Sequence, residues 1–401
     1  MRSPRERRLA RCHSIHDLRG TAKGRLPRAV FDFADGGAED ETTLRRNTAG
    51  FDRFELVPKV LVDVADVRIN TSILGQQIDL PVILAPTGMN RLFHPDGERA
   101  VARAGHRAGT VYTLSSMSSM SIAELAAAAP AGLNWFQVYV WRDRGLVKEL
   151  FSRCRESGYD ALCLTVDVPV LGQRERDLRN GMTMPPRLTA GAILDAAAHP
   201  NWWWRFLMNP RPTFSNVIGQ GEAGKADASV LGTYVNTQFD PSVDWDDLAW
   251  MIEEWGGPFA IKGISRPADA RRAADVGVGA VFVSNHGGRQ LDAAISAIDA
   301  LPAIIEEVGD DVEVVLDGGV RRGTDVVKAL ALGARACAIG RAYLYGLASG
   351  GEPGVERALE LMEREIRRAM ALVGCPDIVD LDASFVRERS DSVGRASSLS
   401  A

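Results

Sequence analysis

The sequence predicts an α/β chain folded as a (β/α)8 TIM barrel with an N-terminal helical segment and a long insertion after the fourth strand. Eight short apolar runs recur along it, as buried parallel strands require. Six of the seven intervals between them span roughly 20–35 residues and contain a helix-like Ala/Leu/Arg stretch. Each run ends in glycine or polar residues, as expected of eight strand ends around one ligand. The runs are Val82–Ala85, Val111–Leu114, Trp135–Val140, Ala161–Val166, Phe259–Ile261, Ala280–Val283, Val312–Leu316 and Ala336–Ile339.

Composition excludes several classes of protein. The 401 residues are 46% hydrophobic and 25% charged, which suits a soluble globular protein, and residues 31–385 are assigned to one domain. The net charge of −5 gives no overall basic field for nucleic acid. The five cysteines form no C-x-x-C pair, which predicts reduced thiols rather than disulfides or a metal site. We find neither a signal peptide nor the ~18 apolar residues of a spanning helix, and expect a cytoplasmic protein.

The chain begins with a basic arm and helix, residues 1–30. Nine Lys/Arg stand here against two acids, a local charge of +7. The arm could meet an anionic membrane surface, but a solvated, partly disordered start is the preferred interpretation. The other expected elements are a helix over Ser14–Ala29 that Leu26-Pro27 interrupts, a turn at Gly36-Gly37, a helix over Thr42–Phe54, a hairpin from Val67–Ile73 and Gln77–Leu80, closing helices over Ala342–Ala348 and Gly354–Val373, and a disordered Ser-rich tail, 386–401.

The most informative stretch is Val281–Asp292, which follows the sixth run and contains His286, Gly287-Gly288 and Arg289. Histidine titrates near neutral pH and can take a proton, and the planar guanidinium of arginine matches a carboxylate. A base beside an anion clamp is therefore predicted. The alternative is a structural histidine with a surface arginine.

Four other strand ends carry charged side chains. After the last two runs come Asp317-Gly318-Gly319 with Arg321, and Gly340-Arg341. Barrels often bind phosphate at this place, so a phosphorylated ligand is expected; turn glycines with solvated arginines are the alternative. Lys262 ends the fifth run, where it could form a Schiff base or stabilise an anionic cofactor. Asp167 ends the fourth and could fix the tautomer of His286.

Seven motifs in order resemble the FMN-dependent α-hydroxy acid dehydrogenase/oxidase family from about Ser14 to Leu381. They are Pro86–Met89, Trp135–Tyr139, Leu164–Pro169, Ile261–Gly263, Ser284–Asp292, Leu316–Gly323 and Ala338–Arg341. The resemblance implies an enzyme that holds FMN and oxidises an L-2-hydroxy acid to the 2-oxo acid, by hydride transfer or through a carbanion. It also implies a homotetramer.

The resemblance assigns the site residues. His286 becomes the catalytic base and Asp167 its partner. Arg289 and Arg174 bind the substrate carboxylate, although for Arg174 alone a surface salt bridge is an equal alternative. Tyr139 bonds the substrate hydroxyl. Lys262 stabilises the anionic reduced flavin rather than forming an imine. The other FMN contacts are Thr87, Gly88, Ser115, Gln137, Thr165 and Ser284 for the ring and ribityl, and Asp317, Gly319, Arg321, Gly340 and Arg341 for the ribityl and phosphate.

Two positions depart from the family pattern. Many members have Tyr where this chain has Phe33, and a lost hydrogen bond to a charged group costs roughly 1.5–3 kcal/mol. Either carboxylate affinity falls, or the ring packs against a larger, aromatic substrate side chain, as in hydroxymandelate oxidase-like relatives. Glycolate oxidase-like members have Trp where this chain has Met117, which leaves more room above the flavin. Both changes argue against a strict glycolate preference.

The insertion, residues 188–241, contains Trp202-Trp203-Trp204 within an apolar 194–207 segment. Aromatic residues favour membrane interfaces, whereas a lid or a subunit contact is the alternative. Its pattern is most similar to quinone-linked L-lactate dehydrogenases. The leading hypothesis is thus a lactate dehydrogenase-type enzyme with a quinone or another carrier as acceptor. For its location, a peripheral position on the inner face of the cell membrane, through the 194–207 loop, stands as an alternative to the loop acting as a lid or subunit contact. The alternatives are an oxidase that uses O2 and forms H2O2, a mandelate-type specificity, or a flavin-binding scaffold without turnover.

Overall fold

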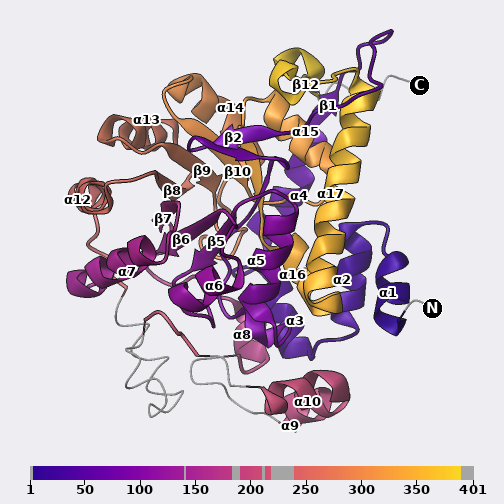
Figure 1. Ribbon diagram of the computed structural model, residues 1–401, viewed down its shortest axis with the longest axis vertical. Helices are drawn as coiled ribbons and strands as arrows, with labels where there is room; N and C mark the ends of the chain where they lie inside the picture. The colour runs from indigo at the N-terminus through magenta and orange to yellow at the C-terminus, as the bar shows by residue number, and fades with distance from the viewer. Residues whose placement is uncertain (1–2, 140, 183–189, 210–212, 218–238, 390–401) are drawn as a thin grey trace, which may run out of the picture.

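The computed structural model describes residues 3–139, 141–182, 190–209, 213–217 and 239–389. Its centre is a closed barrel of eight parallel strands, in which β11 pairs with β4 to complete the ring (Figure 1). The predicted fold class is confirmed. The strands are β4 (Val82–Leu84), β5 (Tyr112–Ser115), β6 (Asn134–Val138), β7 (Ala161–Thr165), β8 (Phe259–Ile264), β9 (Ala280–Ser284), β10 (Glu313–Asp317) and β11 (Ala336–Ile339).

Helices surround the barrel, and local capping explains where several begin. The side chains of Ser121 and Asp244 each accept a backbone N–H from the first turn of the helix that follows them. The side chain of an acidic residue three positions later accepts, in turn, the backbone N–H of the capping residue. The surrounding helices are α5 (Gly97–Arg107), α6 (Ile122–Ala128), α7 (Arg144–Glu156), α12 (Trp245–Trp255), α13 (Pro267–Val276), α14 (Ala297–Val308), α15 (Gly323–Ala331), α16 (Arg341–Gly350) and α17 (Glu352–Val373).

The amino end of the barrel is closed. Two large rings, Trp135 and Phe282, pack edge to face at 6.3 Å inside it. The expected hairpin, here β2 (Thr71–Ile73) and β3 (Gln76–Ile78), lies across this end, and Trp135 Nε1 donates to Gln76 Oε1 at 2.9 Å. A ligand therefore enters from the carboxyl ends of the strands.

The N-terminal arm corrects an expectation. Instead of a partly disordered start, residues 4–10 form α1 (Pro4–Ala10), because Ser3 and Glu6 make a capping box and Pro4 suits the first helical turn. Helices α2 (Ile15–Lys23) and α3 (Arg28–Asp35) are separated at Leu26-Pro27, as expected.

The next helix is shorter than predicted. Helix α4 (Thr42–Ala49) is followed by a 3-10 turn, η1 (Gly50–Arg53), and then by β1 (Phe54–Leu56).

The first residues of the predicted disordered C-terminal tail form a strand instead. Val386–Glu388 forms β12, antiparallel to β1, with Phe54 opposite Glu388. The start of the expected disordered tail is therefore ordered, and residues 390–401 lie outside the described part of the chain. Two short 3-10 turns, η3 (Ile378–Asp380) and η4 (Ala383–Phe385), lead from α17 to this strand.

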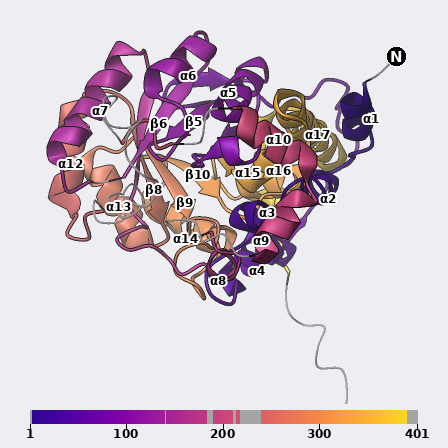
Figure 2. The ribbon, with the colours of Figure 1, turned by 90° about the horizontal axis from the view of Figure 1, so that it is seen from below.

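The described part of the insertion contains two short helices, which lie against the N-terminal segment (Figure 2). In α9 (Ala190–Ala197), Asp195 Oδ2 accepts from the backbone N–H of Arg28 at 2.5 Å. In α10 (Pro200–Met208), Trp202 Nε1 donates to the carbonyl of Leu92 at 2.7 Å. No helix among the described residues is long and apolar enough to cross a membrane.

Candidate active site

A cavity of about 530 Å³ opens at the carboxyl ends of the strands. Most of the predicted site residues line it, so the fold collects them from loops far apart in sequence. They are Phe33, Thr87, Gly88, Ser115, Met117, Tyr139, Arg174, Lys262, His286, Arg289, Asp317, Gly319, Arg321, Gly340 and Arg341. The other four predicted residues, Gln137, Thr165, Asp167 and Ser284, are not in the wall, but strand pairing or hydrogen bonds join each to a residue that is.

His286 and Asp167 form a pair, with 2.9 Å between Nδ1 and Oδ1. His286 has φ 57°, an uncommon backbone angle for a residue with a side chain, and two glycines with positive φ follow it. Gly263 faces the pair, since a Cβ there would lie 2.7 Å from the Cβ of Asp167. The backbone of the two loops thus holds His286 against Asp167.

The charges of this pair are set by burial and by each other. Burial lowers the pKa of His286, opposed by the Asp167 charge and hydrogen bond. Burial would raise the pKa of Asp167, but the His286 charge and hydrogen bond and the Lys262 charge leave it below its ordinary value. At neutral pH the histidine is therefore neutral and the aspartate ionised.

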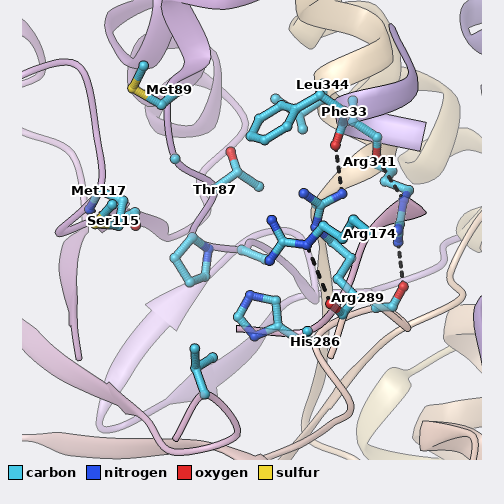
Figure 3. Close-up of a pocket in the computed structure, with 18 of the residues that line it drawn as sticks. Phe33, Thr87, Met89, Ser115, Met117, Arg174, His286, Arg289, Arg341 and Leu344 are labelled. Atoms are coloured by element: carbon cyan, nitrogen blue, oxygen red, sulfur yellow. Dashed lines mark hydrogen bonds between the residues drawn. The ribbon is translucent and has the colours of Figure 1, made fainter. Parts of the chain in front are cut away.

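Two arginines meet the same space, where Figure 3 shows Arg174 and Arg289 converging above His286. Arg174 Nε donates to the carbonyl of Arg289 at 3.4 Å. Burial, together with the charges of Arg174 and Arg341, lowers the pKa of Arg289 well below its usual value. A bound carboxylate would compensate this buried positive charge, so the cluster suits an anionic substrate.

Arg289 is held from one side by α3. Its Nη1 donates to the carbonyl of Phe33 at 2.6 Å, and its guanidinium carbon lies 5.2 Å from the Phe33 ring centre. The ring of Phe93 stacks on Phe33, with centroids 6.4 Å apart. Phe33 therefore contacts Arg289 both through its backbone carbonyl and through its ring.

Lys262, Ser284 and Asp317 form a closed triangle below the cavity. Lys262 Nζ donates to Ser284 Oγ at 2.7 Å and to Asp317 Oδ2 at 2.5 Å, and Ser284 Oγ donates to the same carboxylate at 2.7 Å. Burial would lower the pKa of Lys262, but the charges of Asp317 and Asp167 raise it above its ordinary value. A protonated amine is no nucleophile, so the geometry argues against imine chemistry.

Tyr139 lines the cavity and remains a phenol. Burial, with the Asp167 charge, raises its pKa to about 12. Its ring packs edge to face on Phe239 and Trp141, at 5.1 Å and 6.4 Å. The hydroxyl can therefore donate a hydrogen bond at any physiological pH.

The predicted phosphate end is more complex than expected. Helix α16 begins at this end, and its N-cap, Gly340, makes no side-chain capping bond, which leaves first-turn N–H groups for an anion. Gly319 has φ 82°, and a Cβ there would meet the Asn47 carbonyl at 1.8 Å, so the loop requires glycine. Arg341, in contrast, donates to the carbonyls of Ala34, Gly36 and Gly287. Its main visible role is to tie two loops together.

Sequence reasoning missed the apolar wall and one polar residue. The wall residues share no spacing in sequence, since they come from the β4–α5 connection, from the segment that follows β7, from the insertion and from α16: Met89, Phe93, Val168, Leu171, Leu178, Met182, Phe214, Phe239 and Leu344. Gln290 stands beside Arg289 within the quoted motif, and its adjacency was the available signal. Its amide donates to the carbonyls of Asp167 and Val170 at 3.1 Å and 2.9 Å.

Comparison with known proteins agrees with this geometry. A sequence profile described as FMN-dependent dehydrogenase matches residues 22–388. The chain belongs to this family. It is 45% identical to an L-lactate oxidase of Nostoc sp. over 93% of this chain and 97% of that protein. It is 42% identical to an L-lactate dehydrogenase of Caulobacter vibrioides over 95% and 99%. The crystal structure of a monotopic membrane protein, (S)-mandelate dehydrogenase, superposes with a TM-score of 0.91 at 38% identity, covering 94% of this chain and all of that one.

The family implies FMN as cofactor, and the site has unsatisfied groups that fit it. Gln137 Nε2 and Thr165 Oγ1 are buried without a partner among the described residues, and buried polar atoms normally have one. Lys262 offers a permanent positive charge, and the N-terminus of α16 with the Gly319 loop offers N–H groups for a phosphate. The individual FMN contacts, Arg321 and Arg341 among them, stay predictions.

Proposed function

We propose that this enzyme oxidises an L-2-hydroxy acid of the lactate type to the 2-oxo acid, with a quinone or another carrier as electron acceptor. Oxidation of a 2-hydroxy acid with FMN follows from the family. One observation carries the proposal: His286, whose Nδ1 lies 2.9 Å from Asp167 Oδ1, lines the same cavity as Arg174 and Arg289. A base and a carboxylate clamp are the two groups that a 2-hydroxy acid requires.

The roles of the residues follow from their charges. Because ionised Asp167 can only accept, His286 Nδ1 carries the proton and Nε2 has the free lone pair. Nε2 is then the atom that takes a proton from the substrate. Arg289 and Arg174 hold the carboxylate, and Tyr139 donates to the hydroxyl oxygen. When bound, FMN supplies the two-electron oxidation.

An anaerobic substrate panel tests the reaction. Holoenzyme is mixed with L-lactate, D-lactate, glycolate and L-mandelate, and the loss of flavin absorbance is followed in a stopped-flow instrument. The proposal expects rapid bleaching by L-lactate and none by D-lactate. If no 2-hydroxy acid bleaches the flavin, the chain is a flavin-binding scaffold and the proposal fails.

The acceptor is tested on the same reduced enzyme. Relatives at similar identity include both an oxidase and a dehydrogenase, so identity does not choose between them. Reduced enzyme is mixed with aerated buffer or with a quinone analogue under anaerobic conditions. The proposal expects fast reoxidation only with the quinone. Rapid reoxidation by air, with formation of H2O2, would assign an oxidase instead.

A second specificity, for a mandelate-type aryl substrate, is favoured by the apolar wall. Met117, Leu178 and Met182 line the cavity together with Phe214 and Phe239, and these side chains suit an aromatic ring better than a methyl group. The structural similarity to (S)-mandelate dehydrogenase points the same way. A higher kcat/KM for L-mandelate than for L-lactate in the panel would replace lactate by this candidate.

We also propose that α10 rests on a membrane surface. Trp202 faces the protein, but Trp204, Leu207 and Met208 are 62%, 57% and 64% exposed, and the monotopic neighbour supports an interfacial position. Co-sedimentation with vesicles tests this, with Trp204→Ser and Leu207→Ser expected to reduce binding. Unchanged sedimentation of these variants would favour the lid or subunit contact. The homotetramer and the cytoplasmic location stay predictions.

A further inference from the structure

A second cavity lies outside the active site, between α10 and the loop that joins β4 to α5. Its volume is about 250 Å³. Four arginines line it, Arg25, Arg91, Arg99 and Arg205, against a single carboxylate, Asp96. With histidine neutral, this lining has a formal charge of +3, and a concentration of one sign in a concave site attracts counter-ions.

Two arginines of this cavity, Arg91 and Arg205, have no carboxylate acceptor in the described part of the chain, whereas Arg25 Nε donates to the Ala348 carbonyl at 3.2 Å. Arg91 Nε is buried without a partner among the described residues. Arg205 has no carboxylate partner there either, since its Nη1 lies 3.0 Å from His94 Nε2. A buried donor without an acceptor is costly, so an acceptor-rich ligand would be favoured here.

The arginines also repel each other. Burial, together with the charges of Arg8 and Arg205, lowers the pKa of Arg25 to about 10. Asp96 does not neutralise the group, because it is already bonded to His94, and its pKa is lowered by that bond and by Arg99 and Arg205. The excess positive charge therefore comes from the arginines that the fold brings together in this cavity, and not from a single side chain.

We propose that this cavity binds the phosphate group of a phosphate ester or of inorganic phosphate. Guanidinium groups match phosphate oxygens in pairs, and the amides of Asn201 and Asn209 add neutral donors to the wall. The phosphate could belong to a phospholipid headgroup, since the helix that carries Arg205 also exposes Trp204 and Leu207, or to a free ion. Both sources present the same chemistry to the arginines.

The site is separate from the flavin phosphate site, although it approaches the substrate cavity. Phe93 lines both cavities and stacks on Phe33, so one ring forms the shared wall. None of the four arginines lines the larger cavity. Binding here can therefore be measured on the holoenzyme with FMN in place, and without an activity assay.

The test compares wild type with the double variant Arg99→Gln/Arg205→Gln. Both side chains are exposed, so the fold should tolerate the change. Arg368→Gln, an exposed arginine of α17 that does not line the cavity, is the matched control. In the first arm, inorganic phosphate is titrated into holoenzyme by calorimetry, with chloride as a competing anion. We expect saturable binding to wild type and control, and at least a tenfold weaker binding to the double variant.

The second arm identifies the source of the phosphate. Flotation is measured with phosphatidylcholine vesicles with and without phosphatidylglycerol. A loss of binding to the anionic vesicles in the double variant, but not in the control, assigns the site to a lipid headgroup. Phosphate binding without a difference in flotation assigns it to a free phosphate. Equal behaviour of wild type and double variant in both arms, or no binding in either, overturns the proposal.

Discussion

The ring of Phe33 lies 5.2 Å from the guanidinium carbon of Arg289, and the Phe33 carbonyl accepts from Arg289 Nη1 at 2.6 Å. Phe33 thus contacts Arg289, the predicted carboxylate-binding residue, through its ring and its carbonyl, without a hydrogen bond from its side chain. A cation over an aromatic face gains about 0.5–2 kcal/mol, depending on how far it is desolvated.

Restoring the hydroxyl at this position should strengthen carboxylate binding. We expect Phe33→Tyr to lower KM for L-lactate on the order of tenfold, because a hydrogen bond to a charged group is worth about 1.5–3 kcal/mol. Phe33→Leu, which removes the ring beneath Arg289, should raise KM for every 2-hydroxy acid. Steady-state kinetics with lactate and mandelate measure both effects. An unchanged or raised KM in Phe33→Tyr would mean that position 33 does not face the carboxylate.

Removing the base should separate cofactor binding from chemistry. In His286→Ala the flavin spectrum should remain, because the cofactor contacts come from other strand ends, but its reduction by substrate should slow by about 10²–10⁴-fold. Anaerobic stopped-flow absorbance gives both readouts. His106→Ala, an exposed histidine of α5, is the matched control and should behave as wild type. Normal reduction in His286→Ala would refute the assignment of the base.

The pH profile should report the His286–Asp167 pair. The base acts when neutral, and burial lowers the pKa of His286. Activity should therefore be complete at neutral pH and fall only as the pH drops below that lowered pKa. Asp167 raises the pKa of His286, so Asp167→Asn should move the acid limb of kcat/KM to lower pH. The plateau should fall on the order of 10–100-fold, because the tautomer is no longer fixed. A limb that stays in place or moves upward would contradict the pairing.

Sequence reasoning succeeded where the signal was local or belonged to a motif. The run Ala336–Ile339 coincides with β11 because a buried parallel strand is apolar throughout. His286 and Asp167, 119 positions apart, meet because both follow strands of one barrel. Ser3 and Glu6 have the spacing of a capping box, which indicates a helix, but the prediction of a partly disordered start followed the basic composition instead.

Long-range packing left no such signal. The pairing of Phe54 with Glu388 joins the two ends of the chain, and nothing in either segment specifies the other. The apolar wall of the site was missed for the same reason, since Met182 comes from the segment that follows β7, whereas Phe214 and Phe239 come from separate parts of the insertion. Their hydrophobicity alone is equally compatible with an ordinary core.

The triangle of Lys262, Ser284 and Asp317 predicts a test of buried charge. Lys262→Met leaves the Asp317 carboxylate buried beside a thioether, and breaking such a pair costs about 3–5 kcal/mol. We expect a lower Tm for this variant and a recovery of most of that loss in Lys262→Met/Asp317→Asn. Flavin reduction should stay slow in both, because the positive charge is missing. Calorimetry and stopped-flow absorbance check the two halves, and a double variant as unstable as the single one would contradict the pairing.

Gln290 should act as a positioning residue for both halves of the site. Its amide holds the carbonyls of Asp167 and Val170, and its Oε1 accepts from the Gly172 N–H at 3.2 Å and from Arg174 Nη2 at 3.5 Å. One side chain thus ties the loop after β7 to the clamp. Gln290→Met keeps the volume and removes every bond, each worth about 0.5–1.5 kcal/mol. We expect KM for lactate to rise several-fold, with a smaller fall in kcat and full flavin content. Gln290→Glu, which keeps the acceptor but turns a carboxylate toward the two carbonyls, should be the more severe change. If KM is unchanged in Gln290→Met while only Tm falls, the residue stabilises the loop without orienting Arg174.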